Sequence, residues 1–149
     1  MKTLIRNKKA LFDYEILEKF EAGIILTGAE VKSLRLAQGS LKGAYLIFPE
    51  GKPFIKGFSI SKYEFLNSTN YEPLREKALL LNQKEIKKLL QYENNTGLTV
   101  IPLDVYLKNG LIKVTIAVAK GRKMHDKKQV LKERSEKKRV DKIIKNFNN

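Results

Sequence analysis

Two β-rich segments joined by a short turn constrain the fold of this chain more than any other feature. Residues 98–107 and 111–119 are rich in aliphatic side chains, and Lys108-Asn109-Gly110 lies between them. An Asn-Gly step favours the primed turns whose twist matches that of a two-stranded antiparallel ribbon. We therefore expect a β-hairpin here, which commits this part of the chain to an antiparallel sheet.

Further short strands are expected before this hairpin. Residues 14–20 alternate imperfectly between polar and apolar side chains, and residues 24–26 form a second short apolar run. Residues 44–48 and 54–60 flank a compact Pro- and Gly-containing turn, which predicts a second hairpin. A mainly β fold of about six short strands favours a small closed or nearly closed barrel, because closure removes exposed strand edges.

Two helices are expected from capping patterns. Thr27 is followed three residues later by Glu30, and Asn82 is followed at the same spacing by Glu85. Each pair matches the capping box, in which the two side chains satisfy backbone N–H groups at the helix start. Apolar residues at helical spacing follow both pairs, so peripheral helices should pack on the β scaffold.

Three segments show no regular pattern. Residues 1–10 are mostly polar and basic, so we expect an arm, and residues 61–78 are expected to form an irregular loop. Residues 121–149 are expected to form a basic tail after a domain of residues 1–120. Between Leu131 and Val140 the tail has no apolar side chain, so burial cannot offset the entropy of ordering it. We expect it to be disordered in the free protein.

The charge of the chain indicates a polyanionic partner. Thirty Lys and Arg stand against sixteen Asp and Glu, a formal charge of +14, and residues 120–149 hold twelve of the former and four of the latter. Nucleic acid is the first candidate partner and an anionic membrane surface the second. The membrane is disfavoured, because the central tail has no apolar face to insert and no segment is long and apolar enough to span a bilayer.

The absence of cysteine and the single histidine narrow the possible chemistry. Without cysteine there is no disulfide, thiolate metal site or thiol nucleophile, which fits a reducing, cytoplasmic environment. His125 has no orienting partner for acid–base catalysis, and one histidine makes a poor metal site. We therefore expect no cofactor, no metal and no catalytic residue.

Several basic and aromatic positions suit RNA. The run Gly121–Lys128 can neutralise phosphates and stack guanidinium or imidazole planes on bases, although a solvated charge run at a chain end is the alternative. Its position after a strong hairpin favours RNA. The basic run Arg6–Lys9 can reach phosphates from a second side, or be a frayed terminus. The tyrosines can stack on bases or simply pack; the ones considered are Tyr63, Tyr71 and Tyr106.

Two acidic residues have simpler readings than catalysis. Paired carboxylates can perform acid–base chemistry. Glu30, however, is accounted for as the capping residue of a helix. Glu21 is expected either to orient a basic side chain or to accept hydrogen bonds from RNA amino or hydroxyl groups.

The order and spacing of many short motifs resemble the SsrA-binding protein family. The similarity extends from Asn7 to Asn146. The motifs that carry it are Asn7-Lys8-Lys9-Ala10, Tyr14, Glu21-Ala22-Gly23-Ile24, Leu26-Thr27-Gly28, Glu30-Val31-Lys32-Ser33-Leu34-Arg35, Leu79-Leu80-Leu81-Asn82-Gln83, Leu107-Lys108-Asn109-Gly110, Ala117-Val118-Ala119-Lys120-Gly121 and His125-Asp126-Lys127-Lys128.

This resemblance implies a fold, a function and partners. The fold would be a six-stranded barrel related to the oligonucleotide-binding fold. The protein would be a monomer without catalytic activity that binds the tRNA-like domain of transfer-messenger RNA (tmRNA). Its tail, helical on the ribosome, would enter the decoding centre and mRNA path of the small ribosomal subunit. Alanyl-tRNA synthetase and elongation factor Tu would be indirect partners through tmRNA.

The resemblance and the basic motifs together give the candidate site residues. The RNA-binding set is Asn7, Lys8, Lys9, Glu21, Lys32, Leu80, Lys113, Arg122 and Lys123. The ribosome-engaging tail set is Gly121, His125, Asp126, Lys127, Lys128, Ile143 and Ile144. Lys128 stands where the family usually has arginine, and lysine keeps the charge but lacks the planar, bidentate fork.

Two other classes of protein stay open on the residues alone. An RNA-processing enzyme would lose activity on substitution of Glu21, Glu30 or His125. A constitutive ribosomal protein would sediment with all ribosomes in near-stoichiometric amounts and without tmRNA.

Overall fold

The described part of the chain folds into a mainly β body with three α-helices. The computed structural model describes residues 1–67 and 69–122. The strands are β1 Lys2–Arg6, β2 Tyr14–Ile24, β3 Gly39–Ser40, β4 Tyr45–Ile47, β5 Phe54–Lys56, β6 Ser59–Ile60, β7 Lys77–Leu80, β8 Leu98–Lys108 and β9 Leu111–Gly121. The helices are α1 Lys8–Asp13, α2 Gly28–Arg35 and α3 Gln83–Glu93, with a short 3₁₀ helix at Pro49–Gly51.

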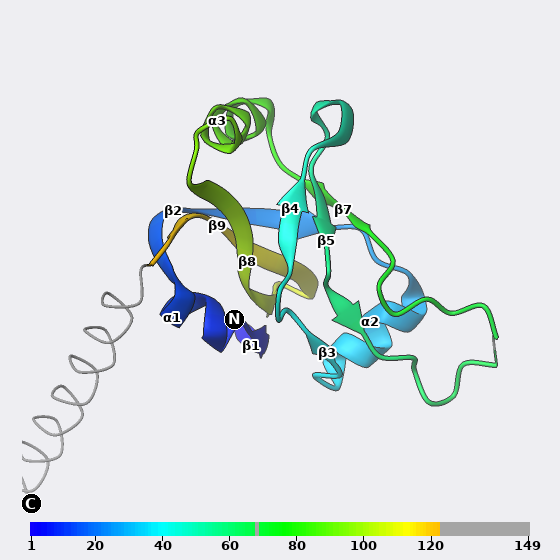
Figure 1. The fold of residues 1–149 in the computed structure, drawn as a ribbon. Helices are drawn as coiled ribbons and strands as arrows, with labels where there is room; N and C mark the ends of the chain where they lie inside the picture. Colours follow the sequence, from blue (N-terminus) through cyan, green and yellow to red (C-terminus); the bar gives the residue numbers. More distant parts are fainter. Residues whose placement is uncertain (68, 123–149) are drawn as a thin grey trace, which may run out of the picture.

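Seven strands form one antiparallel sheet in the order β1-β8-β9-β2-β7-β5-β4, and β3 and β6 form a separate pair (Figure 1). The expected closed six-stranded barrel is wrong: no sheet closes among the described residues. The sheet curls enough to bring β4 against β8, but the two strands are not paired. β4 is only three residues long. β1 contacts β3 and α2. The hydrogen-bonded ladder therefore does not continue from β4 to β1.

The hairpin expected from the Asn-Gly step is confirmed. β8 and β9 pair along most of their eleven residues each, and Lys108 lies opposite Leu111 across the turn. Asn109 and Gly110 have φ angles of 53° and 78°. Positive φ at both central residues is what a type I′ turn requires, and asparagine and glycine tolerate it best.

The expectation of separate strands at 14–20 and 24–26 is wrong. β2 runs without a break from Tyr14 to Ile24 and absorbs a bulge between Ile16 and Glu18. Ile25, in the middle of the apolar run expected to be a second strand, is 51% exposed. The alternation that looked imperfect in the sequence reflects this bulge, because one extra residue changes which side chains face the core.

The N-terminal segment is part of the body, so the expectation of an arm is also wrong. β1 pairs with β8, and Leu4 and Ile5 are buried in the core. Arg6 and Lys2 alternate with these apolar residues only in part, because a bulge lies between Thr3 and Ile5. α1, which follows directly, is a third helix that the sequence patterns did not reveal.

Both predicted capping boxes are confirmed. Thr27 and Glu30 satisfy each other's backbone N–H groups at the start of α2, and Asn82 and Glu85 do so at the start of α3. The second hairpin is confirmed as β4 paired with β5. Its second arm is shorter than expected, because the chain turns away at Gly57, with a φ of 82°, and residues 59–60 form β6.

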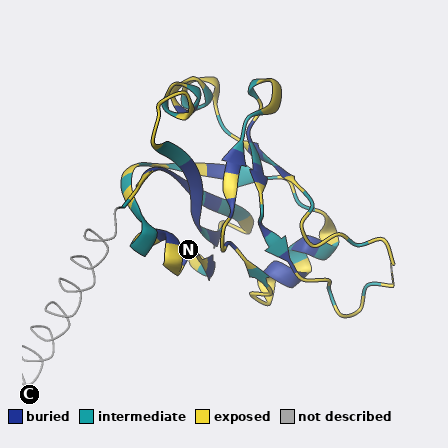
Figure 2. Cartoon of the chain, viewed as in Figure 1, coloured by how far each residue is buried: buried dark blue, intermediate teal, exposed yellow. Residues whose placement is uncertain are grey.

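The central strands β8 and β9 contain many buried residues, which are dark in Figure 2, and these residues are divided between two cores. Val114 and Val118 of β9 belong to the main core, whereas Ala117 and Ala119 belong to a smaller core under α1. Successive residues of a strand point to opposite faces, so one strand can serve two cores. Where α1 does not cover the second face, polar side chains and the exposed Leu80 occupy it.

In the described part of the chain, no helix is long and apolar enough to cross a membrane.

Candidate nucleic-acid interface

A row of paired residues crosses five neighbouring strands on the face that carries α1. Thr3 pairs with Tyr106, Tyr106 with Lys113, Lys113 with Gly23, and Gly23 with Leu80. Residues directly opposite each other in an antiparallel pair point to the same face. We call Thr3, Tyr106, Lys113, Gly23 and Leu80, together with Glu21 and Lys108, the outer row.

Glu21 is the polar centre of the outer row. The Tyr106 hydroxyl donates a hydrogen bond to Glu21, and Lys108 Nζ lies 3.3 and 3.4 Å from its two carboxylate oxygens. The hydrogen bond from Tyr106, then that from Lys108, lowers the pKa of Glu21 below its usual range. This contact corresponds to the first role considered for Glu21, orientation of a basic side chain; its contact with RNA stays a prediction.

Tyr106 packs rather than offering its ring to solvent. Its side chain is buried, and burial followed by the hydrogen bond to Glu21 raises the pKa of its hydroxyl. The hydroxyl therefore stays protonated and remains a donor at all physiological pH values. Tyr106 is thus a positioning residue for Glu21, which in turn holds Lys108.

Leu80 is an exposed apolar side chain at the end of the outer row. It is 59% exposed, whereas the neighbouring Leu79 is buried in the core. Gly23 lies opposite, and a Cβ atom there would lie 3.2 Å from Leu80 Cβ. The absence of a side chain at Gly23 therefore lets Leu80 lie close against β2.

The structure brings three candidate RNA-binding residues together, namely Glu21, Leu80 and Lys113. Asn7, Lys8, Lys9 and Arg122 lie elsewhere, near the opposite end of β2: the Arg122 backbone N–H donates to the Asp13 carbonyl at the end of α1. Lys32 lies in a third place, on α2, with its ammonium 5.4 Å from the centre of the Tyr63 ring.

Asn7 has a structural task in the fold. It is buried, caps α1 by accepting from the Ala10 N–H, and donates to the carbonyls of Leu41 at 3.3 Å and Pro102 at 3.0 Å. These bonds join three segments that are distant in sequence. Asn7 therefore supports the surface around it rather than presenting its own amide to a ligand.

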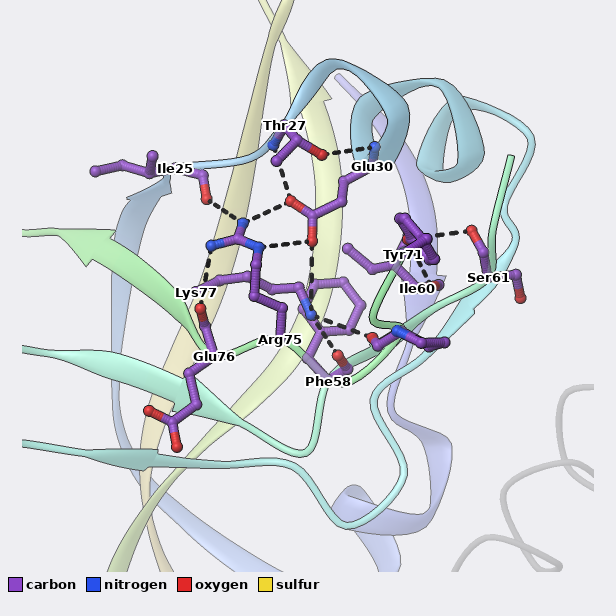
Figure 3. A network of polar contacts seen from close by, with 11 residues as sticks. Ile25, Thr27, Glu30, Phe58, Ile60, Ser61, Tyr71, Arg75, Glu76 and Lys77 are labelled. Atoms are coloured by element: carbon purple, nitrogen blue, oxygen red, sulfur yellow. Dashed lines mark hydrogen bonds and ion pairs between the residues drawn. The ribbon is translucent and has the colours of Figure 1, made fainter. Parts of the chain in front are cut away.

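An ionic network in which Glu30 and Lys77 are buried joins α2 to β7 and to the chain before β7 (Figure 3). Arg75 Nη2 lies 2.6 Å from Glu30 Oε1, and Lys77 Nζ lies 4.0 Å from Glu30 Oε2. Lys77 is completely buried and donates to the Phe58 carbonyl at 2.6 Å. The other tyrosine considered for stacking, Tyr71, donates to the Ile60 carbonyl at 2.8 Å beside this network.

The network sets the protonation of its members. Burial lowers the pKa of Lys77 to about 8, against the opposing effect of Glu30. Burial alone would raise the pKa of Glu30, but hydrogen bonds from Arg75 and the Thr27 N–H bring it below its ordinary value. Glu30 therefore stays ionised at neutral pH, as a cap and ion-pair partner.

Sequence patterns did not reveal that Lys108 contacts Glu21, or that Arg75 and Lys77 contact Glu30. A signal existed for the first: counting outward from the Asn109-Gly110 turn places Tyr106 opposite Lys113, with Lys108 two residues away on the same face. No comparable signal exists for Arg75 and Lys77. They lie within residues 61–78, which were expected to be irregular, and they meet Glu30 only in the folded chain.

Part of the candidate set lies outside the described residues: Lys123, His125, Asp126, Lys127, Lys128, Ile143 and Ile144. Within residues 1–67 and 69–122, no group of three or more His, Cys, Asp or Glu side chains could hold a metal ion.

Fold and surface together define a basic, mainly β protein whose open curled sheet carries charged and apolar side chains in one cross-strand row. The SmpB protein family model matches residues 4–146. The chain belongs to the SmpB family.

Curated relatives and a solved structure agree with this assignment. The SsrA-binding protein of Thermosynechococcus vestitus is 42% identical over 146 residues, which are 97% of this chain and 96% of the relative. That of Clostridium kluyveri is 46% identical over 144 residues, 97% of this chain and 92% of the relative. A chain from a solved structure described as "tmRNA-SmpB: a journey to the center of the bacterial ribosome" superposes with a TM-score of 0.68 at 39% identity, covering 80% of this chain and 85% of that one.

Proposed function

We propose that this protein binds tmRNA, the SsrA RNA, and serves trans-translation, the rescue of stalled ribosomes with tagging of the incomplete peptide. The observation that carries the proposal is the family match along nearly the whole chain, combined with the gathering of Glu21, Leu80 and Lys113 on one surface. The outer row is the surface proposed to contact the tRNA-like domain of tmRNA.

The chemistry of the outer row suits folded RNA. Lys113 and Lys108 supply cations for phosphates, which give affinity without reading sequence. Leu80 offers an apolar surface to a ribose or an unstacked base, and Glu21 holds Lys108 in place. Recognition of shape by such a surface fits a structured RNA better than a linear sequence.

The finer roles belong to the same proposal. The protein acts in the cytoplasm as a monomer and has no catalytic activity of its own. Residues 121–149 engage the decoding centre and mRNA path of the small ribosomal subunit, through Gly121, His125, Asp126, Lys127, Lys128, Ile143 and Ile144. Alanyl-tRNA synthetase and elongation factor Tu meet the protein only through tmRNA.

Capture of cellular RNA tests the proposal directly. The full chain is immobilised, incubated with bacterial RNA and washed, and the retained RNA is sequenced. We expect strong enrichment of tmRNA over bulk tRNA. Retention of tRNA and ribosomal RNA in proportion to their abundance would contradict the proposal and favour a constitutive ribosomal protein, and cleavage of the retained RNA would indicate an enzyme.

Matched substitutions locate the surface. Lys113→Ala is compared with Lys84→Ala on α3, and Leu80→Asn with Leu74→Asn, which removes a leucine of similar exposure, 56% against 59%. Only the outer-row variants should weaken binding to the tRNA-like domain, each by roughly tenfold, the low end of the range for a lost contact of 1–3 kcal/mol. Equal losses of affinity for the outer-row variants and their matched controls would show that the outer row is not the interface.

Truncation after Arg122 separates body from tail. This end point keeps β9 and the backbone bond from Arg122 to Asp13. We expect the truncated protein to retain tmRNA binding and to lose peptide tagging on stalled ribosomes. Equal loss of both activities would contradict this division of roles.

A further inference from the structure

The turn between β8 and β9 contains a reactive pair of residues that no contact in the fold shields. Asn109 and Gly110 are exposed, and Leu111 beyond them is 60% exposed. A Cβ atom at Gly110 would meet no atom within 4 Å, so the space around its backbone is open. Solvent therefore reaches both the side-chain amide of Asn109 and the backbone N–H of Gly110.

These two groups are also free to react with each other. Across residues 1–67 and 69–122, no hydrogen bond joins the Asn109 amide or the Gly110 N–H to another group. Glycine has no side chain to obstruct the approach of its nitrogen to the preceding side-chain carbonyl, and its backbone rotates freely. Asn109 is the only asparagine of the chain that precedes a glycine.

The other asparagines of the body provide internal comparisons. The side chains of Asn7 and Asn82 cap α1 and α3, so their amide oxygens are held by backbone N–H groups. Asn94 and Asn95 follow α3 and are exposed, but the residue after each of them carries a side chain. Asn109 therefore combines exposure, a free amide and an unhindered neighbour.

We infer that Asn109 is a site of spontaneous deamidation, which places a carboxylate beside the outer row. The Gly110 nitrogen loses its proton to a solvent base and forms a bond to the side-chain carbonyl carbon of Asn109. The C–N bond of the side-chain amide breaks and ammonia leaves, which gives a five-membered cyclic imide. Water then opens the imide at either carbonyl and leaves aspartate or isoaspartate. No electrons are exchanged, and water and the solvent base are the only co-reactants.

The hairpin controls the rate of this reaction. Asn109 and Gly110 have φ angles of 53° and 78°, and Lys108 pairs with Leu111 across the turn. A turn closed in this way restricts the rotations that ring closure needs, so the reaction proceeds when the tip of the hairpin opens locally. We expect the folded protein to react more slowly than a peptide of the same sequence. The rate should rise with pH, because the deprotonated nitrogen is the nucleophile.

The new charge would arise next to a cation of the outer row. Lys108, the residue before Asn109, already has its Nζ 3.3 and 3.4 Å from the carboxylate oxygens of Glu21. A second carboxylate near this ammonium offsets its charge and repels an approaching phosphate. This consequence for RNA rests on the proposed function, whereas the deamidation itself does not.

Ageing of the full-length protein in a mildly alkaline buffer tests the inference. Mass spectrometry of tryptic peptides detects the change from amide to acid at each asparagine, and synthetic peptides identify the aspartate and isoaspartate forms. Asn109 should convert before Asn94 and Asn95 and should give both products. Retention of the amide at Asn109 while Asn94 or Asn95 converts, or equal rates at all three, would overturn the inference.

Two variants isolate the effect on RNA. Asn109→Asp carries the charge of the product and should weaken binding to the tRNA-like domain about fivefold, the size of one exposed charge interaction. Asn109→Gly keeps a two-residue turn that tolerates positive φ but has no amide, so its affinity should be that of wild type before and after ageing. Full affinity of Asn109→Asp, or equal losses on ageing for Asn109→Gly and wild type, would overturn the link to the outer row.

The two proposals can fail separately. If the captured cellular RNA is not enriched in tmRNA while Asn109 still converts ahead of the other asparagines, the proposed function fails and the modification site stands. If tmRNA is enriched and Lys113→Ala weakens its binding, while Asn109 keeps its amide throughout ageing, only the modification site is lost.

Discussion

The long-strand region and the short-strand region of this sheet are held together in different ways. β2, β8 and β9 have eleven residues each and pair along most of their length. β4, β5 and β7 have three, three and four residues and pair over two or three positions. Backbone ladders and close packing fix the long strands, whereas the short strands depend on the buried network of Glu30, Arg75 and Lys77.

The comparison shows where a small sheet needs buried charge. A short ladder specifies its register weakly, because few hydrogen bonds resist slippage. In the short-strand region, Lys77 starts β7 and reaches the Phe58 carbonyl and Glu30 at once, so one side chain fixes β7 to the chain before β6 and to α2. The long strands need no such link.

The largest expected effect comes from a cavity in the long-strand region. Ile116→Ala, at a completely buried position of β9, should lower the free energy of unfolding by about 4 kcal/mol, because the rigid strands on either side cannot collapse into the space. Ile55→Ala on β5 is the matched change and should cost about 2 kcal/mol, since short strands can relax. Urea denaturation measures both. A larger loss for Ile55→Ala would reverse the comparison.

Removal of one charge from the network should have the next largest effect. Glu30→Gln retains the capping geometry but leaves the buried Lys77 without its carboxylate, which should cost about 3 kcal/mol. Hydrogen exchange should show faster opening of β5 and β7 with little change in β8 and β9. Glu21→Gln, at an exposed carboxylate on the long strands, is the control and should leave stability nearly unchanged. Uniform loss of protection would show that the two regions unfold together.

Acid should weaken the same region first. The folded-state pKa of Glu30 lies below its ordinary value of 4.5, so its stabilising effect is present above pH 4.5 and is lost as the pH falls through the folded-state value. The midpoint temperature of thermal unfolding, measured from neutral pH to pH 3, should therefore fall more steeply for wild type than for Glu30→Gln. Parallel pH profiles of the unfolding midpoint for the two proteins would show that Glu30 does not cause the loss of stability in acid.

The smallest effect is expected from a surface ion pair on the long strands. Lys88 Nζ lies 2.5 Å from Glu18 Oε1, but both side chains are open to solvent. Such pairs contribute little because water and salt screen them. Lys88→Ala should leave the midpoint of thermal unfolding unchanged within error. A clear drop in the midpoint would show that α3 depends on this bond to stay on the sheet.

The features that the sequence could predict are those that depend on residues close together in the chain. The β8–β9 hairpin and both capping boxes depend on residues close in sequence, so their patterns were visible in advance. The path of β1 and the open edge at β4 depend on contacts between distant segments. The closed barrel was expected because closure removes exposed strand edges, and no local pattern revealed that β4 stops after three residues.

The candidate site divides along the same line. The resemblance singled out Glu21, Leu80 and Lys113, and strand register brings them together. It also singled out Asn7, which lies apart from them and is buried. Residue type and spacing could not reveal that difference, because capping a helix and contacting RNA both suit an asparagine amide.

The bonds of Asn7 affect how an inherited defect at this position should be interpreted. Its amide donates to the carbonyls of Leu41 and Pro102, so an Asn7→Ala allele would displace the loop before β4 and the start of α1 together. The resulting phenotype would report a misshapen scaffold, even if the amide never meets a nucleotide. Suppressors of such an allele should map to the three joined segments and not to the RNA.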